Sequence, residues 1–357
     1  MSSTRTVAMR FFFTPSVFLP PLLLMLMSTA GASLMATKTP LQVALAQALI
    51  ETAFSIKPLY KAISAKAREG IINQGASMGV DWGAEVAAYE RQREVLDRHY
   101  ASLVNANVGM PDYYLRPFHA YDEGNLSWQC AMEVGAAALT VHSNIYTPNR
   151  QTLEIEGDDK LRSSFINCVC EALARDGRGF APTKILDCGC STGLSTLKLA
   201  ESFPNAREII GLDLSAYMLS VAVLDLNSKD EATKRRITYL HGAAEATSLG
   251  ERDVDMVCLS LVSHELPASA SAAAFREAYR LLPSGGCLAL MDIDPQSESF
   301  QRLASNPFGF AAFTSTEPWL AEYIALPLQA ELQSVGFVDV STRSNSPRHR
   351  TVVAWKH

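Results

Sequence analysis

The sequence predicts an α/β protein with a mostly parallel sheet of seven strands, which ends in an antiparallel hairpin and is preceded by a helical cap. From Lys184 to Leu282, short apolar strand patterns alternate with helical patterns, which is typical of βαβ units. Two later strand patterns are separated only by the turn-rich residues 344–347, so these strands should pair antiparallel. Ahead of the sheet, apolar residues recur at helical spacing from Leu41 to about Val104, which predicts the cap.

The strand candidates combine apolar and β-branched residues and are bounded by turn signals. They are Lys184–Asp187, Glu208–Asp213, Ile237–Leu240, Val254–Leu261, Cys287–Asp292, Phe337–Thr342 and Arg350–Trp355. Helical patterns at 195–202, 216–227 and 270–282 lie between them. We therefore divide the chain into a targeting segment (1–36), a helical cap with a substrate-lining segment (37–150) and an α/β domain (151–357).

Composition and charge limit the classes of function. The chain has 357 residues, of which 48% are hydrophobic and 19% charged, as in an ordinary globular enzyme. Its formal net charge is -6, and it has no long basic run, so we expect no nucleic-acid partner.

The first 36 residues have the pattern of a targeting segment. Arg5 and Arg10 precede an apolar stretch at 11–27, and residues 30–32, Ala-Gly-Ala, fit a signal-peptidase site. Three prolines in that stretch argue against a straight membrane-spanning helix, although a membrane anchor is the alternative. The odd number of cysteines, seven, favours a reducing final compartment. We expect a plastid reached through the secretory route, with the secretory pathway itself as the alternative.

Residues 185–193, Ile-Leu-Asp-Cys-Gly-Cys-Ser-Thr-Gly, predict a ligand-binding turn between a strand and a helix. Gly189 and Gly193 allow tight backbone geometry and the close approach of a ligand. Asp187 would repel a pyrophosphate but attract the amino group of a methionine moiety. Asp213 ends the next strand and can accept hydrogen bonds from both ribose hydroxyls, or it is merely a carboxylate at a helix start. A nicotinamide dinucleotide uses a related loop, but the G-x-G-x-x-G spacing is absent.

Two cysteine pairs raise the alternative of a zinc site. Cys168 and Cys170, like Cys188 and Cys190, are separated by one residue, whereas structural zinc sites favour two to four. The second pair also falls in the predicted ligand turn. We predict no metal, and expect these cysteines to be small buried hydrophobes.

Three further motifs accompany the glycine turn. Gly211–Leu219 contains Asp213 with Leu214 and Met218 after it, His241–Glu245 follows the third strand, and Leu282–Gly286 precedes the fifth. Together with the glycine turn, these stretches resemble the class I, Rossmann-like S-adenosylmethionine-dependent methyltransferases over most of the chain from residue 184 to 356. The resemblance implies a Rossmann-like sheet and S-adenosyl-L-methionine as the cofactor.

The same resemblance implies which residues contact the cofactor. Ser191 stands where many members of the class have glycine, and Ala243 stands where many have the aspartate that holds the adenine amine, so that contact passes to Ala244 or Glu245. The implied cofactor-binding residues are Asp187, Gly189, Cys190, Ser191, Gly193, Asp213, Leu214, Met218, Ala244, Glu245 and Ser260.

The acceptor should lie at the carboxyl end of the fourth strand, where ligands of open α/β sheets bind. His264 and Glu265 follow that strand, and histidine is a suitable general base near neutral pH; a structural histidine is the alternative. The aromatic segment at 113–128, ahead of the α/β domain, resembles one in a plant, algal and cyanobacterial group of these methyltransferases. It either lines the acceptor pocket or packs the cap on the core. The predicted acceptor-lining residues are Tyr114, His119, Tyr121, Asn125, Trp128 and Arg348.

The predicted function is transfer of a methyl group from S-adenosylmethionine to a small-molecule acceptor. Arg116, Arg348 and Arg350 could together clamp a carboxylate on that acceptor. One alternative is S-methylation of a thioether acid in algal sulfonium metabolism, which would need no base. Others are a non-catalytic cofactor-binding protein and a nicotinamide-dependent reductase. The acceptor atom and the oligomeric state are not predicted.

Overall fold

The computed structural model describes residues 57–119, 121–147, 152–175, 179–305, 310 and 316–357. The predicted targeting segment and the start of the predicted cap lie outside the described residues. Within the described ranges, no helix has both the length and the apolar character needed to cross a bilayer.

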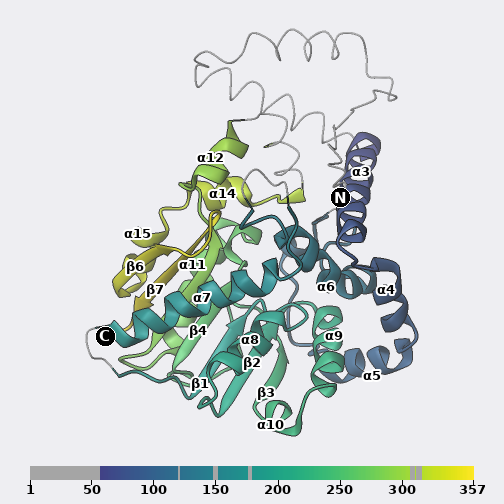
Figure 1. The fold of residues 1–357 in the computed structure, drawn as a ribbon. Coiled ribbons are helices and arrows are strands. Elements are labelled where there is room, and N and C mark those ends of the chain that lie inside the picture. Colours follow the sequence, from purple (N-terminus) through teal and green to yellow (C-terminus); the bar gives the residue numbers. More distant parts are fainter. Residues whose placement is uncertain (1–56, 120, 148–151, 176–178, 306–309, 311–315) are drawn as a thin grey trace, which may run out of the picture. The chain divides into compact units, whose positions relative to one another are not determined.

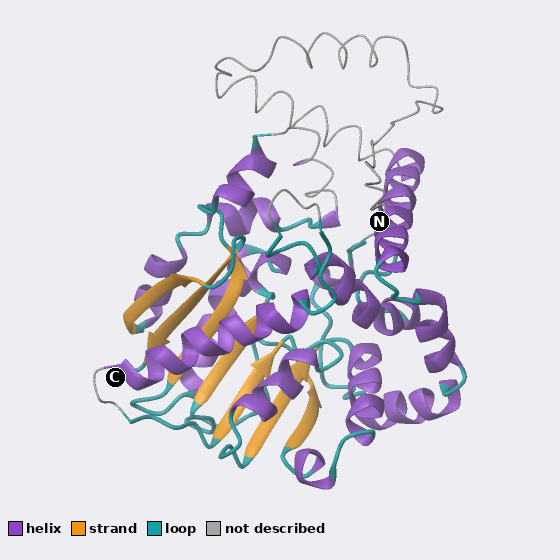
Figure 2. Cartoon of the chain, viewed as in Figure 1, coloured by secondary structure: helices purple, strands orange, loops and turns teal. Residues whose placement is uncertain are grey.

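Seven strands form one mixed sheet, which confirms the predicted fold class (Figures 1 and 2). The strand order is β3-β2-β1-β4-β5-β7-β6. The first five strands pair parallel, and β7 pairs antiparallel with both β5 and β6. The strands are β1 (Lys184–Cys188), β2 (Glu208–Asp213), β3 (Ile237–His241), β4 (Met256–Ser260), β5 (Cys287–Ile293), β6 (Val338–Ser344) and β7 (His349–Trp355).

Helices cover both faces of the sheet because successive strand residues point to opposite sides. Ile185 belongs to a buried cluster with the helices α7, α8 and α9, whereas its neighbour Leu186 belongs to a second cluster with α11 and α15. The helices of this region are α7 (Gly157–Ala174), α8 (Leu194–Ser202), α9 (Ala216–Asn227), α10 (Glu231–Lys234), α11 (Ala268–Leu281), α12 (Glu298–Ala304), α14 (Leu320–Ala325) and α15 (Leu328–Val335). The parallel strands are therefore buried on both sides, as their continuous apolar sequence requires.

The cap is helical, as predicted, and packs on α9 (Figure 1). Leu96 of α5 and Met132 of α6 are fully buried against Met218 and Val221 of α9. The cap elements are α3 (Lys57–Ser77), α4 (Trp82–Glu90), α5 (Arg93–Leu103), the 3-10 helix η1 (Asp112–Leu115) and α6 (Trp128–His142). In the segment between η1 and α6, the Asn125 carbonyl accepts a hydrogen bond from Ser215, which places this segment beside the carboxyl end of β2.

The end of β4 differs from the predicted strand, which ran to residue 261. Leu261 has φ 62°, a left-handed conformation that side-chain-bearing residues adopt rarely and mostly at functional sites. Its N–H still donates to the carbonyl of Met291 at 2.8 Å. The strand therefore ends one residue early, and the chain turns into the short 3-10 helix η4 (Ser263–Glu265).

Candidate functional site

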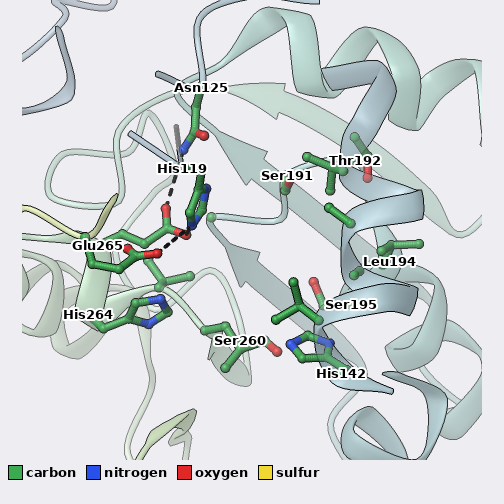
Figure 3. Close-up of a pocket in the computed structure, with 18 of the residues that line it drawn as sticks. His119, Asn125, His142, Ser191, Thr192, Leu194, Ser195, Ser260, His264 and Glu265 are labelled. Atoms are coloured by element: carbon green, nitrogen blue, oxygen red, sulfur yellow. Dashed lines mark hydrogen bonds and ion pairs between the residues drawn. The ribbon is translucent and has the colours of Figure 1, made fainter. Parts of the chain in front are cut away.

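A cavity of about 720 Å³ lies between the carboxyl ends of the parallel strands and the cap (Figure 3). This volume is in the range of small-molecule sites, about 300–1,000 Å³. Of the residues predicted to form the site, Asp187, Gly193 and Trp128 do not line the cavity. The structure brings the others together around it: Tyr114, His119, Tyr121, Asn125, Gly189, Cys190, Ser191, Asp213, Leu214, Met218, Ala244, Glu245, Ser260, His264, Glu265 and Arg348.

The glycine turn after β1 is held against the end of β2. The N–H groups of Gly189 and Cys190 both donate to the carbonyl of Leu212, at 2.7 and 3.0 Å. Gly189 has φ 69°, and a Cβ there would lie 2.7 Å from Cγ2 of Val262. Ser191 also has a positive φ, 51°, at the position where related loops carry glycine. The turn is therefore a tight backbone structure that no larger residue at 189 could form.

Gly193 does not line the cavity and has a packing role at the start of α8. It is the N-cap of α8, with φ 83°, and a Cβ there would lie 2.1 Å from the Tyr239 hydroxyl. A glycine is required because the Tyr239 hydroxyl leaves no space for a side chain at the start of α8.

Asp213 joins the glycine turn to the start of α9. Its two carboxylate oxygens accept from the N–H groups of Ser191 and Ser215, each at 2.8 Å. Burial raises the pKa of Asp213, and these two backbone donors oppose the rise. Since each oxygen has a second lone pair, the carboxylate can still accept hydrogen bonds from a ligand in the cavity.

Asp187 is on the same side of the sheet as Asp213, but it does not line the cavity. Its register partner on β2 is Gly211, two residues before Asp213. The Asp187 carboxylate is fully buried and accepts from Ser195 Oγ and Thr196 Oγ1, both at 2.7 Å. Burial raises its pKa to about 6. Asp187 thus anchors the first turn of α8 through Oδ2, whereas its buried Oδ1 has no hydrogen-bond partner in the protein.

The far end of the cavity is formed by the motif after β3. Glu245 accepts a hydrogen bond from the Tyr113 hydroxyl of η1, and burial together with Glu245 raises the pKa of that hydroxyl. His241 accepts from the N–H of Asn105 at 3.1 Å, and its other ring nitrogen lies 3.0 Å from the carbonyl of Leu214. The cap is therefore hydrogen-bonded both to the end of β3 and to the loop that follows it.

At the end of β4, His264 and Asp292 form a buried pair. The Nδ1 atom of His264 lies 2.7 Å from Oδ1 of Asp292, and its backbone N–H donates to Oδ2 at 3.1 Å. Burial lowers the pKa of His264, but the Asp292 carboxylate outweighs this effect and raises it to about 10. Near neutral pH the imidazole is therefore already protonated, so the predicted role of general base does not suit it in this state.

Glu265 lies beside His119 in the cavity wall (Figure 3), and Glu317 approaches the same histidine. The Nε2 atom of His119 lies 3.1 Å from Oε1 of Glu317 and 3.7 Å from Oε1 of Glu265. Asn125 reaches Glu265 Oε2 at 3.4 Å. Burial raises the pKa of Glu265 to about 7, against the opposing effect of the two histidines. Glu317 was missed by sequence reasoning because no motif surrounds it.

The three arginines predicted to clamp a carboxylate do not meet. Arg348 lines the cavity and donates to the carbonyl and side-chain oxygens of Asn144, at 2.9 and 2.6 Å. Arg116 instead stacks over Trp319, 4.9 Å from the ring centroid, and Arg350 reaches the Tyr323 hydroxyl at 3.3 Å.

Trp128 does not line the cavity and packs the cap against α9. Its ring meets Tyr217 edge-on with the centroids 5.0 Å apart, and Arg93 lies over it at 4.6 Å. For this residue the alternative of cap packing holds.

The cavity continues toward α3 and α7, in a part that the sequence did not indicate. Glu133 of α6 is buried and binds both Arg68 and the Tyr121 hydroxyl, the latter at 2.6 Å. His142 and Arg162 both bind Asp158, at 2.7 and 2.8 Å. Helical spacing could have indicated that Asp158 and Arg162 interact, since they are four residues apart.

The described residues contain no group of three or more ligating side chains that could hold a metal ion. Cys188 and Cys190 are buried, Cys168 is partly buried and Cys170 is exposed.

Comparison with known proteins identifies the class of the α/β domain. Residues 185–286 match the family described as a methyltransferase domain. The chain is 31% identical over 110 residues to an uncharacterised methyltransferase of Synechocystis sp., spanning 31% of this chain and 47% of that protein. It is 33% identical over 141 residues to trans-aconitate 2-methyltransferase of Methylobacterium radiotolerans, spanning 40% and 47%. The chain thus spans about half the length of these relatives.

Among solved structures, the chain is similar to phosphoethanolamine N-methyltransferase 2 of Haemonchus contortus in complex with S-adenosyl-L-methionine, with 17% sequence identity. Its TM-score is 0.40, with 53% of this chain and 52% of that chain covered. The family match is what defines the domain: residues 185–286 are a methyltransferase domain. The predicted family, enzyme class and cofactor are confirmed for this domain.

The cavity suits that cofactor by the chemistry of its donors and acceptors. Asp213 offers carboxylate oxygens beside the glycine turn. Ser260 also lines the cavity, and its buried hydroxyl has no hydrogen-bond partner in the protein. Buried polar atoms are almost always paired, so a ligand that supplies a partner for Ser260 is the expected occupant.

Proposed function

We propose that this protein transfers the methyl group of S-adenosyl-L-methionine to a small-molecule acceptor. The observation that carries the proposal is a single cavity that joins the glycine turn and Asp213 to the pair His264 and Glu265. The cofactor, when bound, supplies an electrophilic sulfonium methyl group. The work left to the protein is to align the acceptor with it and to exclude water.

The chain's own residues divide these tasks. Asp213 would hold the ribose of the cofactor through its carboxylate oxygens, and Leu214, Met218 and Glu245, which line the same cavity, would contact its adenine. The cap covers the cavity through η1 and the segment that holds His119 and Asn125, which limits access of water.

For an acceptor that must lose a proton, we assign the general base to Glu265. A useful base has a pKa near the working pH, and burial raises the pKa of Glu265 to about 7. His264, whose pKa is raised to about 10 by Asp292, instead serves as a fixed cation that adjoins Glu265 in the chain. A thioether acceptor would use neither as a base.

The proposal is tested by binding and by transfer. Titration calorimetry should show that the full chain binds S-adenosylhomocysteine and does not bind NADH. Protein incubated with methyl-labelled S-adenosylmethionine and a small-molecule extract should then produce a labelled product, which mass spectrometry identifies. Binding of NADH instead would overturn the assignment, whereas cofactor binding without transfer into any extract would support the non-catalytic alternative. A labelled sulfonium product would identify a thioether acceptor.

We also propose that residues 1–36 are a targeting segment that leads to a plastid. The support is the sequence pattern alone: basic residues, an apolar stretch and small residues at a cleavage-type site. A fusion of residues 1–36 to a fluorescent protein in algal cells should localise to the plastid. Retention of the fusion in the cytoplasm would contradict the proposal.

A further inference from the structure

We propose that the methyl acceptor is a primary or secondary amine, bound by the carboxylates of Glu265 and Glu317. This inference rests on the proposed function and names the substrate class of the same site. It is carried by the arrangement of two carboxylates around one imidazole in the cavity wall, and by one carboxylate oxygen that the protein leaves without a partner.

The two carboxylates come from parts of the chain that are far apart in sequence. Glu265 ends η4 after β4, and Glu317 precedes α14. Both line the cavity, and both approach the same atom, Nε2 of His119. Two acidic groups that converge on one nitrogen donor form a binding geometry for a cationic nitrogen.

Glu317 carries the second observation. The residue is only 6% exposed, yet its Oε2 atom has no hydrogen-bond partner, while Oε1 lies 3.1 Å from Nε2 of His119. A buried carboxylate oxygen without a donor is destabilising. An amine has two or three N–H groups, so it can satisfy this oxygen and Glu265 together, which an ether, ester or carboxylate group could not do.

His119 occupies both carboxylates when no acceptor is bound. Burial lowers its pKa, but the Glu317 carboxylate outweighs that effect and the pKa is raised. Its backbone has a positive φ of 49°, and its N–H donates to the carbonyl of Thr316 at 3.1 Å. His119 and an incoming amine therefore compete for the same two carboxylates.

The transfer step balances with these groups. The bound ammonium gives one proton to the Glu265 carboxylate, which frees the nitrogen lone pair. That pair forms the new N–C bond while the S–C bond of the sulfonium breaks, and the bonding pair stays on sulfur as a neutral thioether. The product is an N-methylammonium ion, whose charge the Glu317 carboxylate stabilises.

The test compares three probes that differ only in their head group: n-hexylamine, hexan-1-ol and hexanoic acid. Each is titrated calorimetrically into the full chain saturated with S-adenosylhomocysteine. We expect the amine to bind at least about tenfold more tightly than the alcohol, since a hydrogen bond to a charged group is worth that factor or more. Equal or weaker binding of the amine would overturn the proposal, even where S-adenosylhomocysteine binds and the proposed function stands.

Two variants with opposite expected effects separate recognition from simple damage. Glu317→Gln should weaken amine binding by about 10- to 100-fold, whereas His119→Asn should strengthen it, because the competing cation is removed. Glu322→Gln is the matched control: Glu322 lies on α14, outside the cavity, and accepts from the N–H of Ala268, which glutamine can also do. All three must bind S-adenosylhomocysteine like the parent. If Glu317→Gln and Glu322→Gln bind the amine equally, or if His119→Asn weakens it, the amine site is refuted.

Discussion

Replacing Gly193 with alanine should destabilise the protein by two separable effects. The first is backbone strain, because φ is 83° and a left-handed conformation costs a residue with a Cβ about 1–2 kcal/mol. The second is a clash, because the new Cβ would lie 2.1 Å from the Tyr239 hydroxyl and 2.9 Å from the ring carbon that carries it. Overpacking of this kind costs about 1–3 kcal/mol. We therefore expect a loss of about 2–5 kcal/mol in the free energy of unfolding.

Urea denaturation followed by circular dichroism measures this loss, and two comparisons divide it. Gly285 has a similar φ of 87°, but nothing lies within 4 Å of its Cβ position, so Gly285→Ala reports the strain alone. Tyr239→Phe removes the atom at 2.1 Å and leaves the carbon at 2.9 Å, so it should recover roughly 1 kcal/mol of the Gly193→Ala loss in a double-mutant cycle. The reasoning is refuted if Gly193→Ala loses no more than Gly285→Ala, or if the effects of 193 and 239 simply add.

Substitutions at Asp213 and at the buried His264 give two other predictions. In calorimetry, Asp213→Asn should weaken S-adenosylhomocysteine binding by about 10- to 100-fold, the value of a hydrogen bond to a charged group. The control is Asp225→Asn, which alters a carboxylate of α9 that binds Tyr89 and should leave this binding unchanged. Equal losses in the two variants would contradict the role of Asp213. The pKa of His264 is raised from 6.5 to about 10 by Asp292, so this pair stabilises the fold fully below pH 6.5 and loses its effect as pH rises through 10. The difference in melting temperature between the parent and His264→Gln should therefore shrink from pH 6.5 to 10, and a constant difference would disprove it.

The sheet could be predicted from sequence because its signals are local. Apolar runs such as Ile185-Leu186 and Ile209-Ile210 lie between turn residues, and helical patterns separate them. The hairpin of β6 and β7 was recognisable from the short polar turn between two strand patterns. The exact end of β4 was not, because the positive φ of Leu261 depends on how the chain turns toward His264, and the residue type itself gives no warning.

The sequence predicted the cofactor side of the site better than the acceptor side. The glycine turn and Asp213 belong to motifs whose residues are close in the chain. For Asp187, the sequence shows the spacing from Gly189. It does not show that the hydroxyls of Ser195 and Thr196 bind its Oδ2, because these partners are identifiable only once α8 is placed. Glu317 was missed for a related reason, since it meets His119 only through the fold.

The segment that holds Tyr114, His119 and Asn125 is hydrogen-bonded to Asp213 and Ser215 at the end of β2. Ser215, whose N–H binds Asp213, also donates its hydroxyl to the carbonyl of Asn125 at 2.6 Å. The Tyr114 hydroxyl reaches Asp213 itself at 3.4 Å. A ligand that orders Asp213 therefore also orders the segment that positions His119 and Asn125 beside Glu265. Because this wall is assembled partly on Asp213, removing the Tyr114 or Ser215 hydroxyl should alter acceptor choice and cofactor affinity together. His119 instead bonds to Glu317 and to Glu265, so His119 and Glu317 are the positions where acceptor choice alone can change.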